Sequence, residues 1–212
     1  MAATFETFVR AARGSDAPAL ADLQLGCWQE AYSGVLPAES LAAMAAGRDE
    51  IVERWRASAA DPPGPRYHVL VAVDGGTELV GAAAVGPAEE SPDLNPAAVG
   101  ELLVLQVAAA HRRSGNGSRL LAASVDHLRE DGFVHAVLWV DDADGATAAL
   151  LLASGWAPDG TTRTLDLDAD GAVLVHQARW HTDLSPSADS DPPSTTAPSS
   201  TTAPPPEQED RP

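Results

Sequence analysis

The stretch that decides the fold runs from Val99 to Leu121 and reads VGELLVLQVAAAHRRSGNGSRLL. Its first part, Gly100 to Val107, is an apolar run of the length expected for a buried β-strand. A short loop with two glycines follows, and a helical pattern of apolar residues begins at Arg119. Glycine lets the backbone come close to a ligand, and the free N–H groups of a helix N-terminus attract negative charge. The stretch therefore predicts a binding site for a phosphate or a pyrophosphate.

Two common phosphate-binding motifs do not fit this loop. A dinucleotide fingerprint requires a third glycine three residues after Gly117, where the chain has Leu120. A P-loop requires Gly-Lys-Ser or Gly-Lys-Thr after four spacer residues, and the sequence contains no such string. The remaining pattern, Arg112-x-x-Gly115-x-Gly117, resembles the acetyl-CoA-binding loop of the GNAT family of N-acetyltransferases.

The resemblance includes four further markers between about Phe8 and Leu184. In chain order they are Val9 to Asp16, Trp28 to Pro37, Leu105-x-Val107 and Gly155-Trp156. The first two are similar to the first strand and helix of the family, the third to its bulged fourth strand, and the last to its late glycine-aromatic pair. The resemblance implies an α/β fold with a mixed, mostly antiparallel central sheet flanked by helices. It also implies acetyl-CoA as co-substrate and transfer of the acetyl group to a primary amine of a small molecule or peptide, by direct attack.

The resemblance implies a set of residues that hold acetyl-CoA. Backbone groups of the fourth strand would pair with the pantetheine arm, and amides of the loop would hold the pyrophosphate, with two arginines adding positive charge. The predicted set is Leu105, Gln106, Val107, Arg112, Arg113, Ser114, Gly115, Asn116, Gly117 and Ser118. The alternative is an ordinary strand–helix turn, although such a turn needs one glycine and not two after paired arginines.

Glu101 is the predicted catalytic residue. It lies just inside the apolar strand and matches the position at which several family members carry a general-base glutamate. Partial burial would raise its pKa and make it a better base near neutral pH. The alternative is a strand-end carboxylate that faces solvent or caps a neighbour. His111, the other titratable group near the loop, is expected to have a surface role.

The sequence departs from the family pattern where the leaving thiolate would be protonated. Many members carry a tyrosine four residues before the glycine-aromatic pair and an asparagine six residues before that, and here these positions are Leu151 and Gly145. Leucine cannot donate a proton. Either solvent or another group replaces the acid, or the protein binds acyl-CoA without turning it over. A coenzyme A thiol is about as acidic as free cysteine, with a pKa of roughly 8.5, so loss of the acid need not abolish turnover.

Trp28 and Tyr32 are the candidates for acceptor binding, because they lie four residues apart on one helical face. Packing on the sheet is the alternative for both. Asp141, Asp142 and Asp144 resemble a metal cluster only superficially, since they stand between a strand and a helix, where capping and solvation are the usual roles. No metal is predicted.

Composition limits the class of protein. The chain of 212 residues is long enough for one core and a little short for two. The formal net charge of −18 argues against nucleic acid as a partner, because phosphate neutralisation needs clustered Lys and Arg. A single cysteine, Cys27, fits a reducing compartment, and its place on the apolar face of the predicted first helix makes burial in the core the expectation. The sequence contains neither a signal-peptide pattern nor an apolar run of membrane-spanning length. We therefore expect a cytoplasmic protein without a membrane partner, and leave open whether it forms a homodimer.

Hydrophobic periodicity and turn residues predict one domain over residues 1–184, with helices on both faces of the sheet. Residues 185–212 are Ser, Thr, Pro and acid with almost nothing apolar, and this tail is predicted to be disordered. A partner-binding tail is the alternative. The predicted strands are 7–10, 67–73, 78–85, 100–107, 134–140, 163–167 and 173–180. The predicted helices are 17–32, 37–56 with a break near Gly47, 117–131 and 144–154.

Overall fold

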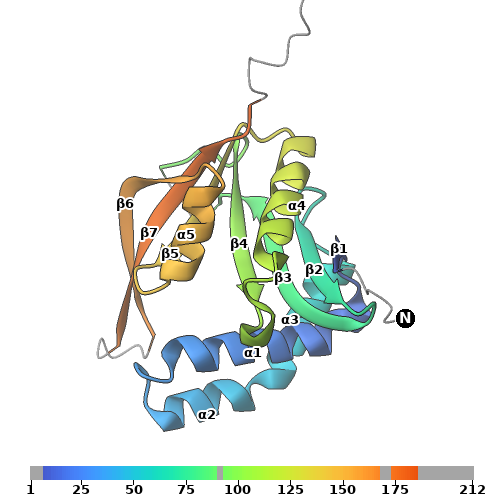
Figure 1. Cartoon of the computed structure of the whole chain (residues 1–212), viewed down its shortest axis with the longest axis vertical. Helices are drawn as coiled ribbons and strands as arrows, with labels where there is room; N and C mark the ends of the chain where they lie inside the picture. The colour runs from blue at the N-terminus through green and yellow to red at the C-terminus, as the bar shows by residue number, and fades with distance from the viewer. Residues whose placement is uncertain (1–6, 90–92, 168–172, 186–212) are drawn as a thin grey trace, which may run out of the picture.

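A seven-stranded sheet forms the centre of the molecule, with the strand order β1-β2-β3-β4-β5-β7-β6 (Figure 1). The computed structural model describes residues 7–89, 93–167 and 173–185. All neighbouring strands are antiparallel except β4 and β5, which are parallel. The strands are β1 (Phe8–Ala11), β2 (His68–Asp74), β3 (Glu78–Pro87), β4 (Val99–Val107), β5 (His135–Asp141), β6 (Ala157–Asp166) and β7 (Leu174–Asp183). The predicted mixed, mostly antiparallel sheet is confirmed.

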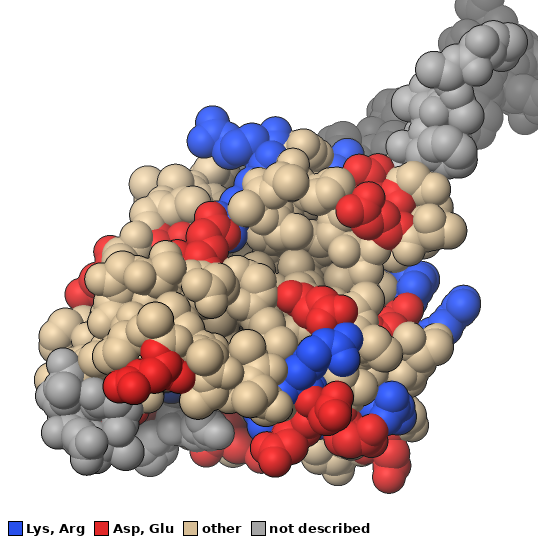
Figure 2. Space-filling model, turned by 90° about the horizontal axis from the view of Figure 1, so that it is seen from below, with Lys and Arg blue, Asp and Glu red and all other residues tan. Residues whose placement is uncertain are grey.

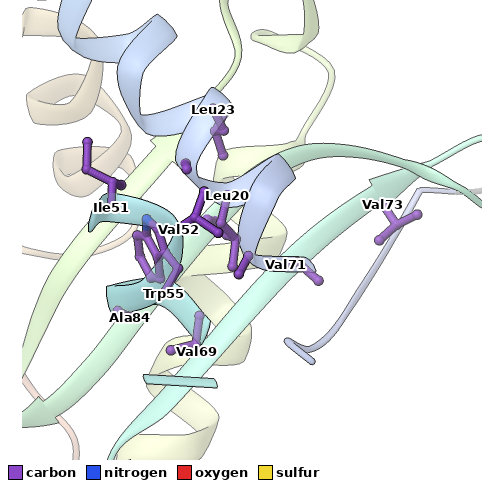
Figure 3. Packing of buried hydrophobic residues seen from close by; sticks show 12 residues of the cluster. Leu20, Leu23, Ile51, Val52, Trp55, Val69, Val71, Val73 and Ala84 are labelled. Carbon is purple, nitrogen blue, oxygen red and sulfur yellow. The ribbon is translucent and has the colours of Figure 1, made fainter. Parts of the chain in front are cut away.

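Helices cover both faces of the sheet. The helices are α1 (Ala17–Tyr32), α2 (Ala38–Ala46), α3 (Arg48–Ala60), α4 (Asn116–Glu130) and α5 (Gly145–Ala153). Alternate residues of β2 separate the two layers. Val69 and Val71 pack with α1 and α3 in the cluster drawn in Figure 3, whereas Leu70 packs with Leu120 of α4 on the opposite face. Leu151 of α5 lies in a third cluster on the α4 side. This alternation follows from the two-residue period of a β-strand.

Local sequence signals account for most of the helix boundaries. The predicted break at Gly47 is confirmed, because its N–H group bonds to carbonyl groups at the end of α2 and α3 begins at the next residue. Asp16 directly precedes α1, but its side chain does not cap that helix. Its carboxylate accepts hydrogen bonds from the Arg10 guanidinium at 2.7 and 2.9 Å and from the Arg13 backbone N–H at 2.7 Å.

Two expectations differ from the structure. Strand β6 begins at Ala157, six residues before the predicted start at Arg163. The added residues are mostly exposed and lack apolar alternation, and the register with β7 shifts between Pro158 and Thr162, so pairing with β7 and not burial defines this part of the strand. Cys27, expected in the buried core, is only partly buried, and its Sγ atom lies 3.9 Å from the Val107 carbonyl oxygen. The predicted disordered tail, residues 185–212, lies outside the described residues from position 186 onward.

Candidate functional site

Strands β4 and β5 are paired only at their beginnings. The register joins Val99 to His135, Gly100 to Ala136 and Glu101 to Val137, and no pair follows. In Figure 1 the two strands diverge toward α1. A bulge at Leu103, whose side chain is 45% exposed, accompanies the divergence, because the register with β3 shifts between Ala84 and Val85. A bulge bends its strand. The second half of β4, with Leu105, Gln106 and Val107, therefore has an edge facing β5 that β5 does not pair.

The loop between β4 and α4 has an unusual backbone. Arg113 and Gly115 both have left-handed conformations, with φ of 63° and 82°. The N–H groups of residues 113–118 donate no hydrogen bond to any described part of the chain, whereas the next N–H group, of Arg119, bonds to the Gly115 carbonyl oxygen at 3.0 Å. Consecutive free N–H groups around left-handed residues form a concave anion site, and the start of a helix strengthens it. Residues 112–118 are therefore called the anion loop.

Side chains hold this loop from outside. His111 lies between two carboxylates of the β2–β3 hairpin, with Nδ1 3.6 Å from Asp74 Oδ2 and Nε2 3.4 Å from Glu78 Oε1. Asn116 is 2% exposed, and its Nδ2 donates to the His111 carbonyl oxygen at 2.9 Å. The surface role expected for His111 is therefore structural, since it attaches the loop to the hairpin.

Arg112 is engaged on the side of the loop that faces α1. Its Nε donates to the Val107 carbonyl oxygen at 3.0 Å, and its two terminal nitrogens donate to the two carboxylate oxygens of Glu30 at 2.8 and 2.7 Å. Arg113, in contrast, makes no ion pair with the described residues. The two arginines predicted to act together thus have different environments.

Gly117 has a packing role that the motif alone does not reveal. A Cβ atom at this position would lie 3.1 Å from Leu150 Cδ2 of α5. The absence of a side chain lets α5 approach the first turn of α4. The same contact places the α4 N-terminus beside α5.

Glu101 is buried, at 5% exposure, so the alternative of a solvent-facing carboxylate is wrong. Its neighbour Gly100 faces α4, because a Cβ atom there would lie 2.5 Å from Leu128 Cδ2. Successive residues of a strand point to opposite faces, so Glu101 lies on the α1 face of the sheet. By register the same face carries Trp139 and Asp141 of β5.

The two predicted acceptor residues lie in different surroundings. The Tyr32 hydroxyl donates to Asp141 Oδ2 at 3.2 Å, and Asp141 Oδ1 accepts from Gln177 of β7. Burial, followed by the nearby Asp141 and Asp144 charges, raises the pKa of Tyr32 to about 12. Trp28 instead lines a cavity of about 250 Å³ between α1 and α2, together with Leu25, Gly26, Gln29, Leu41, Met44 and Ala45. Tyr32 is not part of that cavity's lining.

The remaining predictions at the site concern α5. Leu151 is fully buried and lies in the same core cluster as Trp156, which is the packing expected of a leucine. Asp144 caps α5, since its carboxylate accepts from the Thr147 N–H at 3.0 Å and hydroxyl at 2.7 Å. The described residues contain no cluster of three or more His, Cys, Asp or Glu side chains suited to a metal ion.

Sequence reasoning missed Glu30 and Gln177. Glu30 is separated from Arg112 by 82 positions and Gln177 from Asp141 by 36, so no local spacing connects either pair. The only signal for Glu30 was its place on the same helix as Trp28 and Tyr32.

Comparison with known proteins identifies the class. The acetyltransferase (GNAT) family model matches residues 19–156, which include most of α1, the diverging strands β4 and β5, and the loop between β4 and α4. The chain belongs to this family. No curated protein sequence matches the chain. Among the helices that the structure describes, none has the length and hydropathy to cross a bilayer.

Solved structures share the fold. An N-acetyltransferase from Staphylococcus aureus Mu50 has 18% identity and a TM-score of 0.64, over 85% of this chain and 99% of that one. A ribosomal-protein-alanine N-acetyltransferase from Brucella melitensis has 22% identity and a TM-score of 0.60, over 83% of this chain and 99% of that one. The PaiA N-acetyltransferase from Thermoplasma acidophilum, in complex with coenzyme A, has 16% identity and a TM-score of 0.58, over 81% of this chain and 98% of that one.

Proposed function

We propose that this protein is an acetyl-CoA-dependent N-acetyltransferase that acetylates a primary amine of a small molecule or peptide. The observation that carries the proposal is the run of free backbone N–H groups at residues 113–118, next to the unpaired edge of β4. Membership of the acetyltransferase family and a structural neighbour in complex with coenzyme A support it.

The chain offers a fitting surface for each part of acetyl-CoA. The N–H groups of residues 113–118 would bind the pyrophosphate, with Ser114 and Ser118 adding hydroxyl groups at the rim. Leu105, Gln106 and Val107 would pair with the amides of the pantetheine arm as a neighbouring strand would. The acetyl group would then lie near the bulge at Leu103, where the two strands separate.

The acceptor amine would approach from the α1 face. Glu101 lies on this face, one pair before the strands diverge, and would accept the ammonium proton directly or through water. Tyr32 and Asp141 lie on the same side, where Asp141 would attract a cationic acceptor. Attack of the neutral amine on the thioester carbonyl, polarised by backbone N–H groups of β4, would release coenzyme A. We also propose a cytoplasmic location and leave homodimer formation open.

The first test is calorimetric titration of acetyl-CoA and coenzyme A, followed by an assay of thiol release with a panel of amines. We expect micromolar binding and thiol release with at least one amine. Glu101→Gln is expected to lower kcat by about a hundredfold or more without changing coenzyme affinity. Glu50→Gln, an exposed position on α3, is the matched control and should leave kcat unchanged. If neither coenzyme binds, the proposal is wrong.

A second candidate is an acyl-CoA-binding protein without turnover. The buried Leu151, at the position of the family's proton-donating tyrosine, is the observation that favours it. This candidate predicts coenzyme binding equal to that of the enzyme but no thiol release with any amine. It also predicts that Glu101→Gln changes nothing.

A further inference from the structure

The guanidinium of Arg112 links three parts of the molecule. The backbone of Arg112 is part of the loop between β4 and α4. Its guanidinium donates to the Val107 carbonyl oxygen at the end of β4 and to the Glu30 carboxylate on α1. The contact with Glu30 is bidentate, with both terminal nitrogens within 2.8 Å of a carboxylate oxygen. A phosphate offers oxygens in the same arrangement, so Arg112 can exchange a carboxylate for a phosphate without changing the form of the contact.

The carboxylate of Glu30 also cancels the charge that Arg112 brings to the loop. The pair is half-exposed, with 40% of the arginine and 45% of the glutamate side chain accessible. Exposed ion pairs are weak and open readily. On the side of the molecule shown in Figure 2, basic side chains form no single large patch, and several lie beside acidic ones. At the loop itself, the Glu30 carboxylate offsets the positive charge of Arg112.

We propose that Glu30 is a positioning residue that holds the Arg112 guanidinium on α1, away from the anion loop, and thereby weakens coenzyme A binding. The inference rests on the proposed function, since it assigns the coenzyme phosphates to residues 113–118. When the coenzyme binds, either the Arg112–Glu30 contact breaks, or the phosphates bind without a contact to the Arg112 guanidinium. Because α1 also carries Tyr32 and Trp28, the same contact connects the coenzyme loop to the acceptor side.

The test is a double-mutant cycle on coenzyme A affinity, measured by calorimetry at low salt in a buffer free of phosphate. Glu30→Gln keeps an oxygen acceptor but removes the charge. We expect it to lower the Kd for coenzyme A by about tenfold while Arg112 is present, and by about threefold or less in the Arg112→Gln background. The gain should shrink as ionic strength rises.

The matched control is Asp22→Asn. Asp22 also lies on α1 and holds an arginine in a bidentate, exposed pair, with Arg48 nitrogens at 2.6 and 2.9 Å. It precedes Glu30 by two helical turns, beyond the screening length of about 8 to 10 Å in ordinary buffer. Asp22→Asn removes the surface pair with Arg48 and is expected to leave the Kd for coenzyme A unchanged. Thermal unfolding should show that all variants are folded.

Each outcome decides the inference. A larger gain with Arg112 than without it supports capture of the guanidinium. Equal decreases in Kd in both backgrounds would mean that Glu30 acts only through its negative charge and not through Arg112. An unchanged or raised Kd in Glu30→Gln would mean that the pair orders the loop for binding. Either result overturns the inference, while coenzyme binding by the wild-type protein still upholds the proposed function. Absence of coenzyme A binding by the wild-type protein overturns the proposed function itself and the inference with it.

Discussion

Gly115 is the residue on which the geometry of the anion loop depends most directly. It adopts φ of 82° immediately before α4, and a Cβ atom there would lie 3.0 Å from Arg119 Nη1. A residue other than glycine in this conformation costs about 1 to 2 kcal/mol. Gly115→Ala is therefore expected to lower the free energy of unfolding by about that amount. It should also weaken coenzyme A binding, because the adjoining N–H groups would turn. Urea denaturation and calorimetric titration measure the two effects.

Gly145 provides the control for that substitution. It begins α5, has no left-handed backbone, and a Cβ atom there would meet nothing within 4 Å. Gly145→Ala is expected to leave both the stability and the affinity unchanged or slightly improved, since alanine favours a helix. Similar losses at both glycines would show that backbone conformation at Gly115 is not what shapes the loop.

Spacing along the chain predicts local features of the site but not the contacts between distant residues. The glycines of the loop lie two positions apart, so a glycine turn leading into a helix was predictable from the sequence. The packing of Gly117 against Leu150 of α5 was not. The contacts that surround the site were not. Tyr32 and Asp141 meet across 109 positions, and Glu30 and Arg112 across 82. Such pairs depend on how α1 lies across the sheet, which periodicity does not specify.

At the scale of elements, the junction of β1 and α1 depends on Asp16. The hydrogen bond from Arg10 holds the pKa of Asp16 below its ordinary value, with partial burial opposing and the Arg13 backbone N–H assisting. A carboxylate whose pKa is lower in the folded state stabilises the fold above its unfolded pKa of about 3.9, and this stabilisation is lost as the pH falls through the folded pKa. The junction is therefore expected to weaken in acid.

Asp16→Asn tests this junction. The substitution is expected to lower the free energy of unfolding by about 1 to 2 kcal/mol at neutral pH, as loss of a charged hydrogen bond does. The difference from wild type should shrink as the pH falls below about 4. Urea denaturation at several pH values measures it, with Asp61→Asn at an exposed loop position as control. A difference that stays constant down to pH 2, roughly two units below the unfolded pKa, would contradict this account.

Elements with a buried face were predictable, and those defined by pairing alone were not. The continuous apolar run of β2, from Val69 to Val73, identifies a strand because both faces are covered, by α1 and α3 on one side and α4 on the other. The first half of β6 has no covered face and carries Pro158 and Gly160, so its sequence resembles a loop. Hydrophobic patterning reports burial, and an exposed edge strand lacks it.

At the scale of the whole molecule, Leu184 is the last of the described residues that packs in the core. Leu184 is 2% exposed and belongs to the core cluster of α4, β5 and α5, and its N–H donates to the Val134 carbonyl oxygen at 2.9 Å. Its own carbonyl oxygen accepts from Arg129 Nε at 3.3 Å. A chain ending at Ser185 should keep both contacts, while a chain ending at Asp183 should lose them. The cost of the second truncation should be near that of deleting a buried leucine, about 2 to 5 kcal/mol.

Differential scanning calorimetry and coenzyme A titration of the two truncated chains test this boundary. The chain ending at Ser185 is expected to unfold within about 1 °C of the full-length protein and to bind coenzyme A with the same Kd, because residues 186–212 carry too little apolar sequence to contribute to a core. The chain ending at Asp183 should unfold several degrees lower, at about 2 to 4 °C for each kcal/mol lost. If removing residues 186–212 instead abolished thiol release while leaving coenzyme binding intact, the tail would be part of the working protein, and an interaction through its Pro, Ser and Thr residues would replace the domain-only account.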